Sequence, residues 1–324
     1  MTRIVLDSGG TEVNAGSGAG DPAADTLRAA TLKEKAWAAD INTMTDELYI
    51  AAGGKYNPNS ILTPLNIYDP LRWHRWFDDF ITGPSMTTSE VKSAWTQVPD
   101  FGEWTAKAAR DGGGIIERNL QGGGTTVGGS WLQVSAQNTA GDYMHICAPD
   151  AGGEIPGATS IPPTSATKMY AVALKLACPP DPNTRYVCGI GEVQSDAPAK
   201  LLSGAAVPGI YVRIVNDVAT VHINNYEYAV PKTATLPTTV TIVAGRAYEF
   251  ELLWTGLGTF IGQYRYSTDA PYYVSPWTSL GSIDVSTWQF ASSNMAAGPW
   301  MGAHSISTSG AELGVDYLMF AAER

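Results

Sequence analysis

Two glutamates in the run YEFELLW, Glu249 and Glu251, are the residues whose type and spacing most directly suggest chemistry. Side chains of a β-strand alternate between its two faces, so residues that are two apart share a face. A pair of carboxylates can serve as acid and nucleophile in glycoside hydrolysis. The alternative, which we expect, is a strand that turns both glutamates to solvent and the apolar residues between them to a core.

A second kind of chemistry is offered by the aromatic run DAPYYVSPW, which contains Tyr272, Tyr273 and Trp277. A pyranose presents an apolar C–H face that an aromatic ring can cover, and a Pro-flanked loop loses little entropy on binding. These three residues are therefore glycan-contact candidates. In the competing interpretation the same rings close the open end of a β-sandwich. We expect three other tryptophans, each in or beside an apolar run, to lie in the core: Trp254, Trp288 and Trp300.

The other groups with reactive side chains give no recognisable site. The four histidines are scattered without metal-ligand spacing, which predicts polar or half-buried side chains and no metal site: His74, His145, His222 and His304. The three cysteines form no C-x-x-C pair, and we expect reduced, buried thiols, although Cys178 and Cys188 could face each other across a turn. The sequence contains no G-x-S-x-G elbow and no P-loop, and GGGTTVGG at 122–129 is predicted to be a surface loop. No cofactor and no enzymatic activity are predicted.

The elements that must position these residues are predominantly strands. The chain has 324 residues, of which 44% are hydrophobic and 16% are charged, with 34 Gly and 20 Pro. Short β-rich runs recur every 8 to 15 residues or so between turn residues, which predicts an antiparallel sandwich or barrel. Asn216-Asp217 is expected to be a hairpin turn. In the run TKMYAVALKLAC, alternation places Tyr170, Val172, Leu174 and Leu176 toward the core.

Residues from about 70 or 100 to 324 resemble the concanavalin A-like lectin/glucanase superfamily in the order and texture of their strands. The segments that carry this resemblance are GSWLQVSAQNTAGDYMHI, YVCGIGEV, GRAYEFELLWTGLGTFIGQYRYS and GPWMGAHSISTSGAELGVDYLMFAAER, the last of which carries Asp316-Tyr317. The resemblance implies a two-sheet antiparallel jelly roll. Glucanases of that superfamily carry E-x-D-x-x-E on one strand, but here the middle acid is Glu251 and the third position is Trp254. Legume-type metal sites are also unmatched.

The stretch LRAATLKEKAWAADINTMTDEL predicts a helix over about 25–52 that begins at Asp25 or Thr26. Its spacing of three and four residues is that of a coiled-coil seam, interrupted by Glu34. The seam residues are Leu27, Ala30, Trp37, Ile41, Met44 and Leu48. Three heptads are short for an independent coiled coil, so the stripe either joins copies of the chain, packs on its own sandwich or docks onto another protein.

Four segments follow from these patterns: an arm over 1–24, the helix over 25–52, a connector and the start of the β domain over 53–100, and the jelly roll over 101–324. This plan resembles bacteriophage appendage proteins such as head fibres, head spikes and tail fibres. The resemblance implies a virion protein made in the host cytoplasm, a homotrimer that attaches to other virion proteins by its N-terminus and contacts host surface polysaccharide. The alternatives are a polysaccharide-degrading enzyme of the same fold and a capsid or tail subunit that binds no sugar.

The remaining sequence features exclude two classes of partner. The net charge is −11 and there is no Lys/Arg run, so nucleic acid is not an expected partner. No apolar stretch has the roughly 20 residues that a transmembrane helix needs, and the N-terminus lacks the apolar run of a secretory signal. We therefore expect no membrane insertion.

Overall fold

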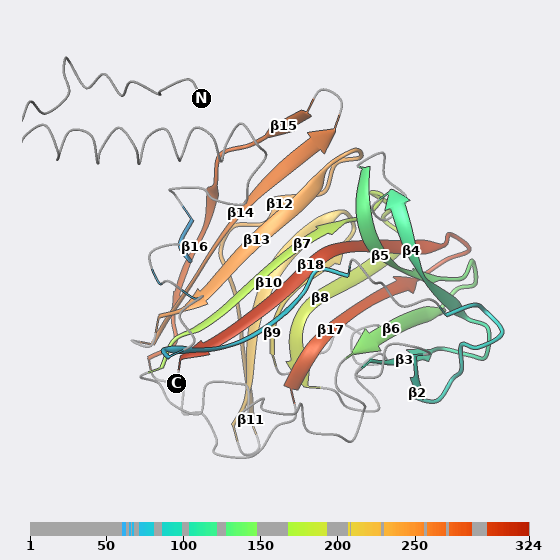
Figure 1. The fold of residues 1–324 in the computed structure, drawn as a ribbon, viewed down its shortest axis with the longest axis horizontal. Coiled ribbons are helices and arrows are strands. Elements are labelled where there is room, and N and C mark those ends of the chain that lie inside the picture. The colour runs from blue at the N-terminus through green and yellow to red at the C-terminus, as the bar shows by residue number, and fades with distance from the viewer. Residues whose placement is uncertain are drawn as a thin grey trace, which may run out of the picture. The chain divides into compact units, whose positions relative to one another are not determined.

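The described part of the chain folds into two antiparallel sheets, the jelly-roll sandwich that the sequence predicts (Figure 1). The computed structural model describes residues 60–62, 65, 67, 71–80, 86–98, 104–121, 128–147, 168–192, 207, 209–227, 230–255, 258–269, 272–286 and 297–323. The chain divides into two units, Met1–Thr63 and Pro64–Arg324, and the sandwich belongs to the second. The seam residues of the predicted helix all lie outside the described residues.

Each sheet contains nine strands among the described residues. The first sheet consists of β1 (Trp73–Asp78), β4 (Gly114–Gln121), β5 (Gly128–Ala136), β7 (Tyr170–Ala177), β13 (Ala247–Trp254), β14 (Thr259–Asp269), β15 (Tyr272–Val274), β16 (Thr278–Asp284) and β18 (Ala311–Glu323). The second consists of β2 (Thr96–Gln97), β3 (Thr105–Ala108), β6 (Tyr143–Cys147), β8 (Thr184–Glu192), β9 (Gly209–Val215), β10 (Val218–Glu227), β11 (Val230–Thr235), β12 (Val240–Thr241) and β17 (Ala297–Ser305).

The first sheet runs in the order β15-β14-β13-β7-β18-β5-β4, with β1 paired to the other half of β18 (Figure 1). Trp73, which begins β1, lies opposite Glu323 at the end of β18. The first and last strands of the sandwich are therefore neighbours, on the opposite side of the sheet from β15.

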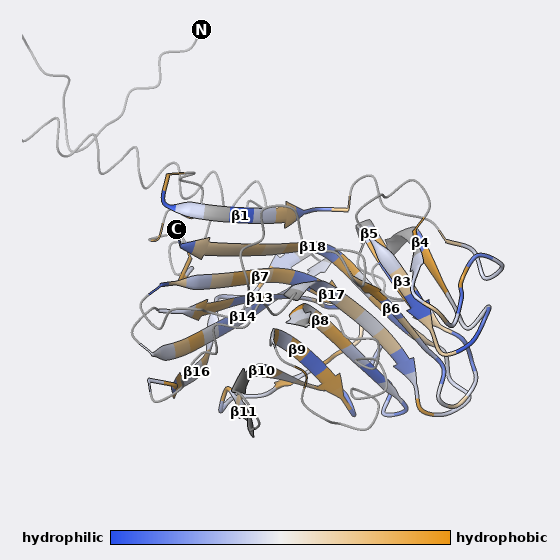
Figure 2. Cartoon of the chain, turned by 90° about the horizontal axis from the view of Figure 1, so that it is seen from below, coloured by the Kyte–Doolittle hydropathy of each residue, from blue (hydrophilic) through white to orange (hydrophobic). Residues whose placement is uncertain are grey.

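The hydrophobic core lies between the two sheets and is built by period-two alternation along the strands. From β7 the core includes Tyr170, Val172, Leu174 and Leu176, as predicted. From β13 it includes Tyr248, Phe250, Leu252 and Trp254. Changes between polar and apolar residues along strands such as β9 are visible in Figure 2. Because one face of every central strand is committed to this core, the polar residues between these positions lie on the outer faces of the sheets.

The predicted turn at Asn216-Asp217 is confirmed. Both residues have left-handed backbone angles, with φ of 51° and 62°, and Val215 of β9 pairs with Val218 of β10. Two consecutive positive φ angles define the two-residue hairpin turn whose twist matches that of the strands, and Asn and Asp tolerate this conformation.

The predictions for the tryptophans and cysteines have mixed outcomes. Trp254 lies in the core, Trp300 is buried on the outer face of the second sheet, and Trp288 lies outside the described residues. All three cysteines are buried free thiols, so Cys178 and Cys188 do not pair. Burial raises the pKa of both of these thiols.

No helix in the described ranges is long and apolar enough to cross a membrane.

Candidate functional site

The glutamates singled out by the sequence lie on the outer face of the first sheet, but they do not face solvent. Glu251 is only 6% exposed, and the side chain of Glu249 is largely buried. The expectation of a solvent-facing pair is therefore wrong. Burying a carboxylate is costly unless donors replace its water, and the neighbouring strands supply those donors.

Glu249 is held by a group from the adjacent strand β14 and by one from β18, which lies beyond β7 on the other side of β13. Arg265 of β14 lies directly opposite it, and the Nε and Nη2 atoms of Arg265 donate to Oε2 of Glu249 at 2.7 Å. From β18, the hydroxyl of Tyr317 donates to Oε1 at 2.5 Å. Burial, followed by the proximity of Glu249, raises the pKa of Tyr317 well above its ordinary value. The phenol therefore stays protonated and donates, while both oxygens of the glutamate act as acceptors.

Glu251 and Gln263 form the next cross-strand pair on the same face. They are also directly opposite each other, and Nε2 of Gln263 donates to Oε2 of Glu251 at 2.8 Å. We refer to Glu249, Glu251, Gln263, Arg265 and Tyr317 as the carboxylate ladder. Its members come from three strands, and it cross-links β13 to β14 and to β18.

A β-bulge in β18 extends the ladder. The register between β18 and β7 shifts between Val315 and Tyr317, so Asp316 is the extra residue. Nζ of Lys175 in β7 lies 2.9 Å from Oδ2 of Asp316 and 5.1 Å from the ring of Trp131. Bulges redirect side chains. Here the bulge allows the consecutive residues Asp316 and Tyr317 both to bond to side chains on the outer face, namely Lys175 and Glu249.

The arrangement of the ladder favours a structural role over proton transfer. A general acid must carry a proton and present it to a substrate, whereas Glu249 already accepts hydrogen bonds at both oxygens. Trp254, which occupies the third motif position, is buried in the core on the opposite face of the strand. Within the described ranges, no three His, Cys, Asp or Glu side chains gather in a way that could hold a metal ion.

The aromatic candidates are placed differently from the expectation of one loop. Tyr272 and Tyr273 lie in β15, which pairs with β14, so this part of the run is a strand. Tyr273 is 46% exposed, and its ring centroid lies 5.9 Å from that of Tyr266. Trp277 is half-buried, and the guanidinium of Arg265 lies 4.6 Å from its ring. The side chain of Tyr272 is outside the described set.

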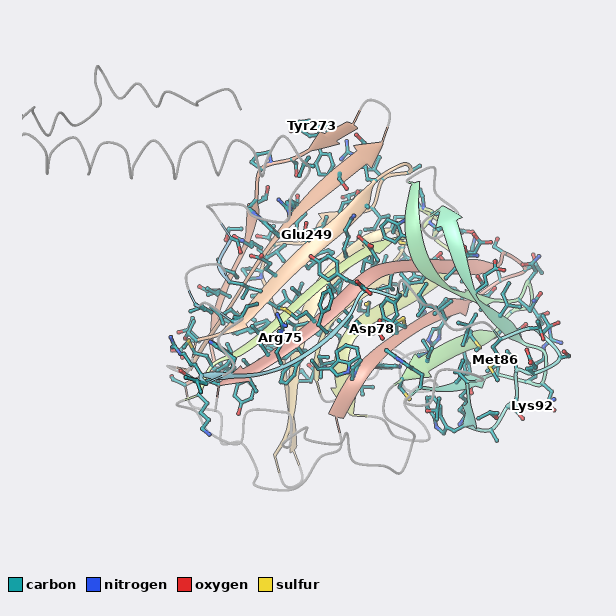
Figure 3. All side chains as sticks on the ribbon, viewed as in Figure 1. Arg75, Asp78, Met86, Lys92, Glu249 and Tyr273 are labelled. Atoms are coloured by element: carbon teal, nitrogen blue, oxygen red, sulfur yellow. The ribbon has the colours of Figure 1, made fainter. Side chains whose placement is uncertain are left out.

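Tyr273 and Trp277 do not share a surface. Their ring partners, Tyr266 and Arg265, are consecutive in β14 and therefore point to opposite faces of the sheet. Trp277 packs against Arg265 of the carboxylate ladder, whereas Tyr273 lies at the sheet edge beside Tyr266. The guanidinium of Arg246 covers Tyr266 at 4.0 Å. We refer to Tyr266, Tyr273 and Arg246 as the edge cluster, of which Tyr273 is labelled in Figure 3.

A third group of functional side chains, on the outer face of the second sheet, was missed by the sequence prediction. His145 is 0% exposed and His304 is 1% exposed, so the expectation of polar or half-buried histidines is wrong for this pair. Their Nε2 atoms are in hydrogen-bond contact. Gly302 lies directly opposite His145, and a side chain there would collide with the imidazole ring. Alternation along β6 and β17 was the available signal, because His145 lies between the core residues Met144 and Ile146, and His304 follows the core residue Ala303.

The tautomers of the two histidines follow from their partners. Indole Nε1 of Trp300 can only donate, and it donates to Nδ1 of His145 at 2.7 Å. Neutral His145 therefore carries its proton on Nε2 and donates it to Nε2 of His304. The proton of His304 is then on Nδ1, which has no hydrogen-bond partner among the described residues. Burial lowers the pKa of His145 well below its usual range and that of His304 to about 3.

Comparisons with known proteins give only distant structural similarities. No family model matches the chain, and no curated protein matches it. A protein of unknown function from Shewanella oneidensis MR-1 is 12% identical, with 83% of this chain and 95% of that chain covered and a TM-score of 0.44. SCLam, a non-specific endo-β-1,3(4)-glucanase of family GH16, is 12% identical, with 79% and 93% covered and a TM-score of 0.40. The CBM2 module of the evolved Dit of Lactobacillus casei BL23 phage J-1 is 10% identical, with 78% and 96% covered and a TM-score of 0.36. We draw no site or activity from similarities at these scores.

The carboxylate ladder predicts strong coupling between Arg265 and Glu249. Arg265→Met should lower the free energy of unfolding by about 3 kcal/mol, because it leaves a buried carboxylate without its cation. Glu249→Met should have a comparable effect for the converse reason. The double variant should lose clearly less than the sum of the two, as measured by urea unfolding in a double-mutant cycle. Additive losses would show that the pair does not act as a unit.

The buried histidine pair predicts a loss of stability in mild acid. The folded-state pKa values lie below the unfolded value of about 6.5, so below that pH the unfolded chain binds protons that the folded chain does not. The free energy of unfolding should therefore fall as pH falls, by about 2 kcal/mol for each histidine between pH 6.5 and 5. His304→Gln should remove one histidine's share of this dependence. Equal pH slopes for the wild-type chain and the variant, measured by urea unfolding at each pH, would contradict the prediction.

Proposed function

We propose that this chain is a structural subunit of a bacteriophage particle, a trimeric fibre or spike subunit that attaches through its N-terminal region and binds host surface glycan through its sandwich. The order of the segments predicted from the sequence supports the proposal: a small-residue arm, a predicted helical seam and a connector precede the β domain. The acidic charge supports a role that does not involve nucleic acid.

The observation that carries the glycan assignment is the exposed ring of Tyr273 in the edge cluster. A large aromatic side chain that is nearly half exposed and supported by another ring is a rigid, amphipathic contact surface. Arg246 beside Tyr266 adds hydrogen-bond donors for sugar hydroxyls. The carboxylate ladder, by contrast, is buried and bonded within itself, so its groups are not offered to a ligand.

The position of Tyr273 suits a protein that attaches at one end. Along the first sheet, β15 and β1 are separated by β14, β13, β7 and β18, which gives five strand spacings or about 24 Å. In Figure 3, Glu249 lies between Tyr273 and the two labelled residues of β1, Arg75 and Asp78. A glycan bound at the edge cluster would therefore lie on the opposite side of the sheet from the strand through which the chain enters the sandwich.

A polysaccharide-degrading enzyme of the same fold is the second candidate, because Glu249 and Glu251 share one face of β13. The hydrogen bonds at Glu249 favour the structural role described above. A subunit that binds no sugar is the third candidate, and it predicts no glycan binding.

The glycan assignment predicts a loss of binding on removal of the Tyr273 ring. Tyr273→Ala should weaken binding to the responsive glycan, in an array of bacterial capsular, O-antigen and cell-wall polysaccharides, by about tenfold, the equivalent of a stacking contact. Tyr273→Phe keeps the ring and should retain most of the affinity.

A control on an unrelated surface is Ile306→Ala, which shortens another exposed apolar side chain. This variant should bind like the wild-type chain. If no polysaccharide binds, the subunit without sugar-binding activity is favoured. If Tyr273→Ala binds normally, the contact lies elsewhere.

The seam assignment predicts a change of mass in the full chain. Wild-type protein should scatter light as a particle of three times the 34.4 kDa chain mass. Ile41→Lys places a charge in the seam and should give monomers, because burying an unpaired ammonium group is unfavourable. Asp46→Lys adds the same group on the flank and should remain trimeric. A monomeric wild-type chain would instead favour packing of the helix on its own sandwich.

A further inference from the structure

A small cavity opens on the second sheet, away from the edge cluster and the carboxylate ladder. Its volume is about 200 Å³, below the roughly 300–1,000 Å³ of sites for drug-sized ligands. It is lined by residues of three neighbouring strands: Tyr211, Arg213, His222, Asn224, Thr233, Ala234 and Thr235. A cavity of this size suits a ligand no larger than about one sugar ring.

Strand register explains why these residues meet. His222 of β10 lies opposite Tyr211 of β9 on one side and opposite Thr235 of β11 on the other. Asn224, two residues further along β10, lies opposite Thr233 and opposite Gly209, which has no side chain to fill the space. The alternation that commits Val221 and Ile223 to the core therefore places His222 and Asn224 on the outer face.

The aromatic and amide groups of the cavity are held in place. The rings of Tyr211 and His222 stack at 5.3 Å with an angle of 10° between their planes. Nδ2 of Asn224 donates to the hydroxyl of Tyr211 at 2.7 Å and to the carbonyl of Val207 at 3.0 Å. Both of its amide hydrogens are thus used, while its buried Oδ1 has no hydrogen-bond partner among the described residues. An acceptor left in this state costs about 1–3 kcal/mol.

The described lining of the cavity contains a cation, in a chain whose net charge is −11. The lining includes the cation Arg213 and no carboxylate among its described side chains. Burial, followed by the nearby charge of Arg213, lowers the pKa of His222 to about 4. His222 is therefore neutral at physiological pH, and the charge of the cavity comes from Arg213.

We propose that this cavity binds a single sugar acid, with the carboxylate of the ligand on Arg213. The stacked Tyr211 and His222 rings form one wall, and the hydroxyls of Thr233 and Thr235 offer hydrogen bonds to the sugar hydroxyls. This site is on a different sheet from the edge cluster, so it does not depend on glycan binding at Tyr273.

The test compares a charged sugar with its neutral counterpart on the full chain. D-Glucuronate and D-glucose are titrated by calorimetry, and glucuronate should bind at least tenfold more tightly. Arg213→Gln should weaken glucuronate binding at least tenfold. Lys107→Gln removes a cation from β3, which lies four strands from β9 in the same sheet and outside the cavity lining, and should leave the affinity unchanged.

A second pair of variants keeps the test decisive if Arg213→Gln does not fold. Thr235 is exposed, so Thr235→Asp adds a carboxylate to the wall at little cost to folding and should abolish glucuronate binding. Thr235→Asn is its uncharged control and should still bind. Tyr273→Ala should also leave glucuronate binding intact, which separates this site from the proposed glycan surface.

Four results would overturn the proposal. The first is equal affinity for glucuronate and glucose, which would remove the role of the carboxylate. The second is unchanged glucuronate binding in folded Arg213→Gln or Thr235→Asp. The third is no binding of glucuronate by the wild-type chain at about 10 mM ligand. The fourth is inorganic phosphate binding as tightly as glucuronate, which would mark a general anion site.

Discussion

The shared core between the two sheets is the constraint on which the other features depend. Tyr170, Leu174, Phe250 and Leu252 reach it only if every second residue of β7 and β13 faces the opposite way. A slip of one residue in either strand would move an entire apolar row out of the core. Polar side chains between these positions must therefore lie on the outer faces. The carboxylate ladder, the histidine pair and the cavity are all consequences of this alternation.

The outer faces show how buried polar groups are tolerated. On the first sheet, the side chain of Glu249 has a guanidinium and a phenol as partners, and these donors offset much of the cost of burial. On the second sheet, His145 and His304 are accommodated without ionisation, since burial keeps both neutral and Trp300 fixes the proton positions. One sheet thus buries charge by pairing it, and the other removes the charge. This difference explains why the two faces should respond differently to acid.

The proposed binding surfaces use different physical chemistry. At the edge cluster, an exposed ring on a supporting ring offers apolar contact area at small entropic cost, which suits an extended polysaccharide. In the cavity, a cation and fixed hydrogen-bonding groups surround a space for one small molecule. The two surfaces lie on different sheets, so the multi-copy particle subunit proposed above would engage a polymer at one and a sugar acid at the other. Multivalent presentation would raise the apparent affinity of weak single contacts.

The fold class, the hairpin turn at Asn216-Asp217 and the core face of residues 170–176 could all be predicted from the sequence, because they depend on local alternation and on turn chemistry. Alternation also predicted that Glu249 and Glu251 share one face. Their burial could not be predicted, because Arg265 and Tyr317 reach Glu249 only across strand pairs. Only the tertiary structure joined His145 to His304, which are 159 residues apart, and separated Tyr273 from Trp277 onto opposite faces of the sheet. Period-two patterning fixes which side of a strand a residue occupies, whereas the pairing of distant strands decides what it meets there.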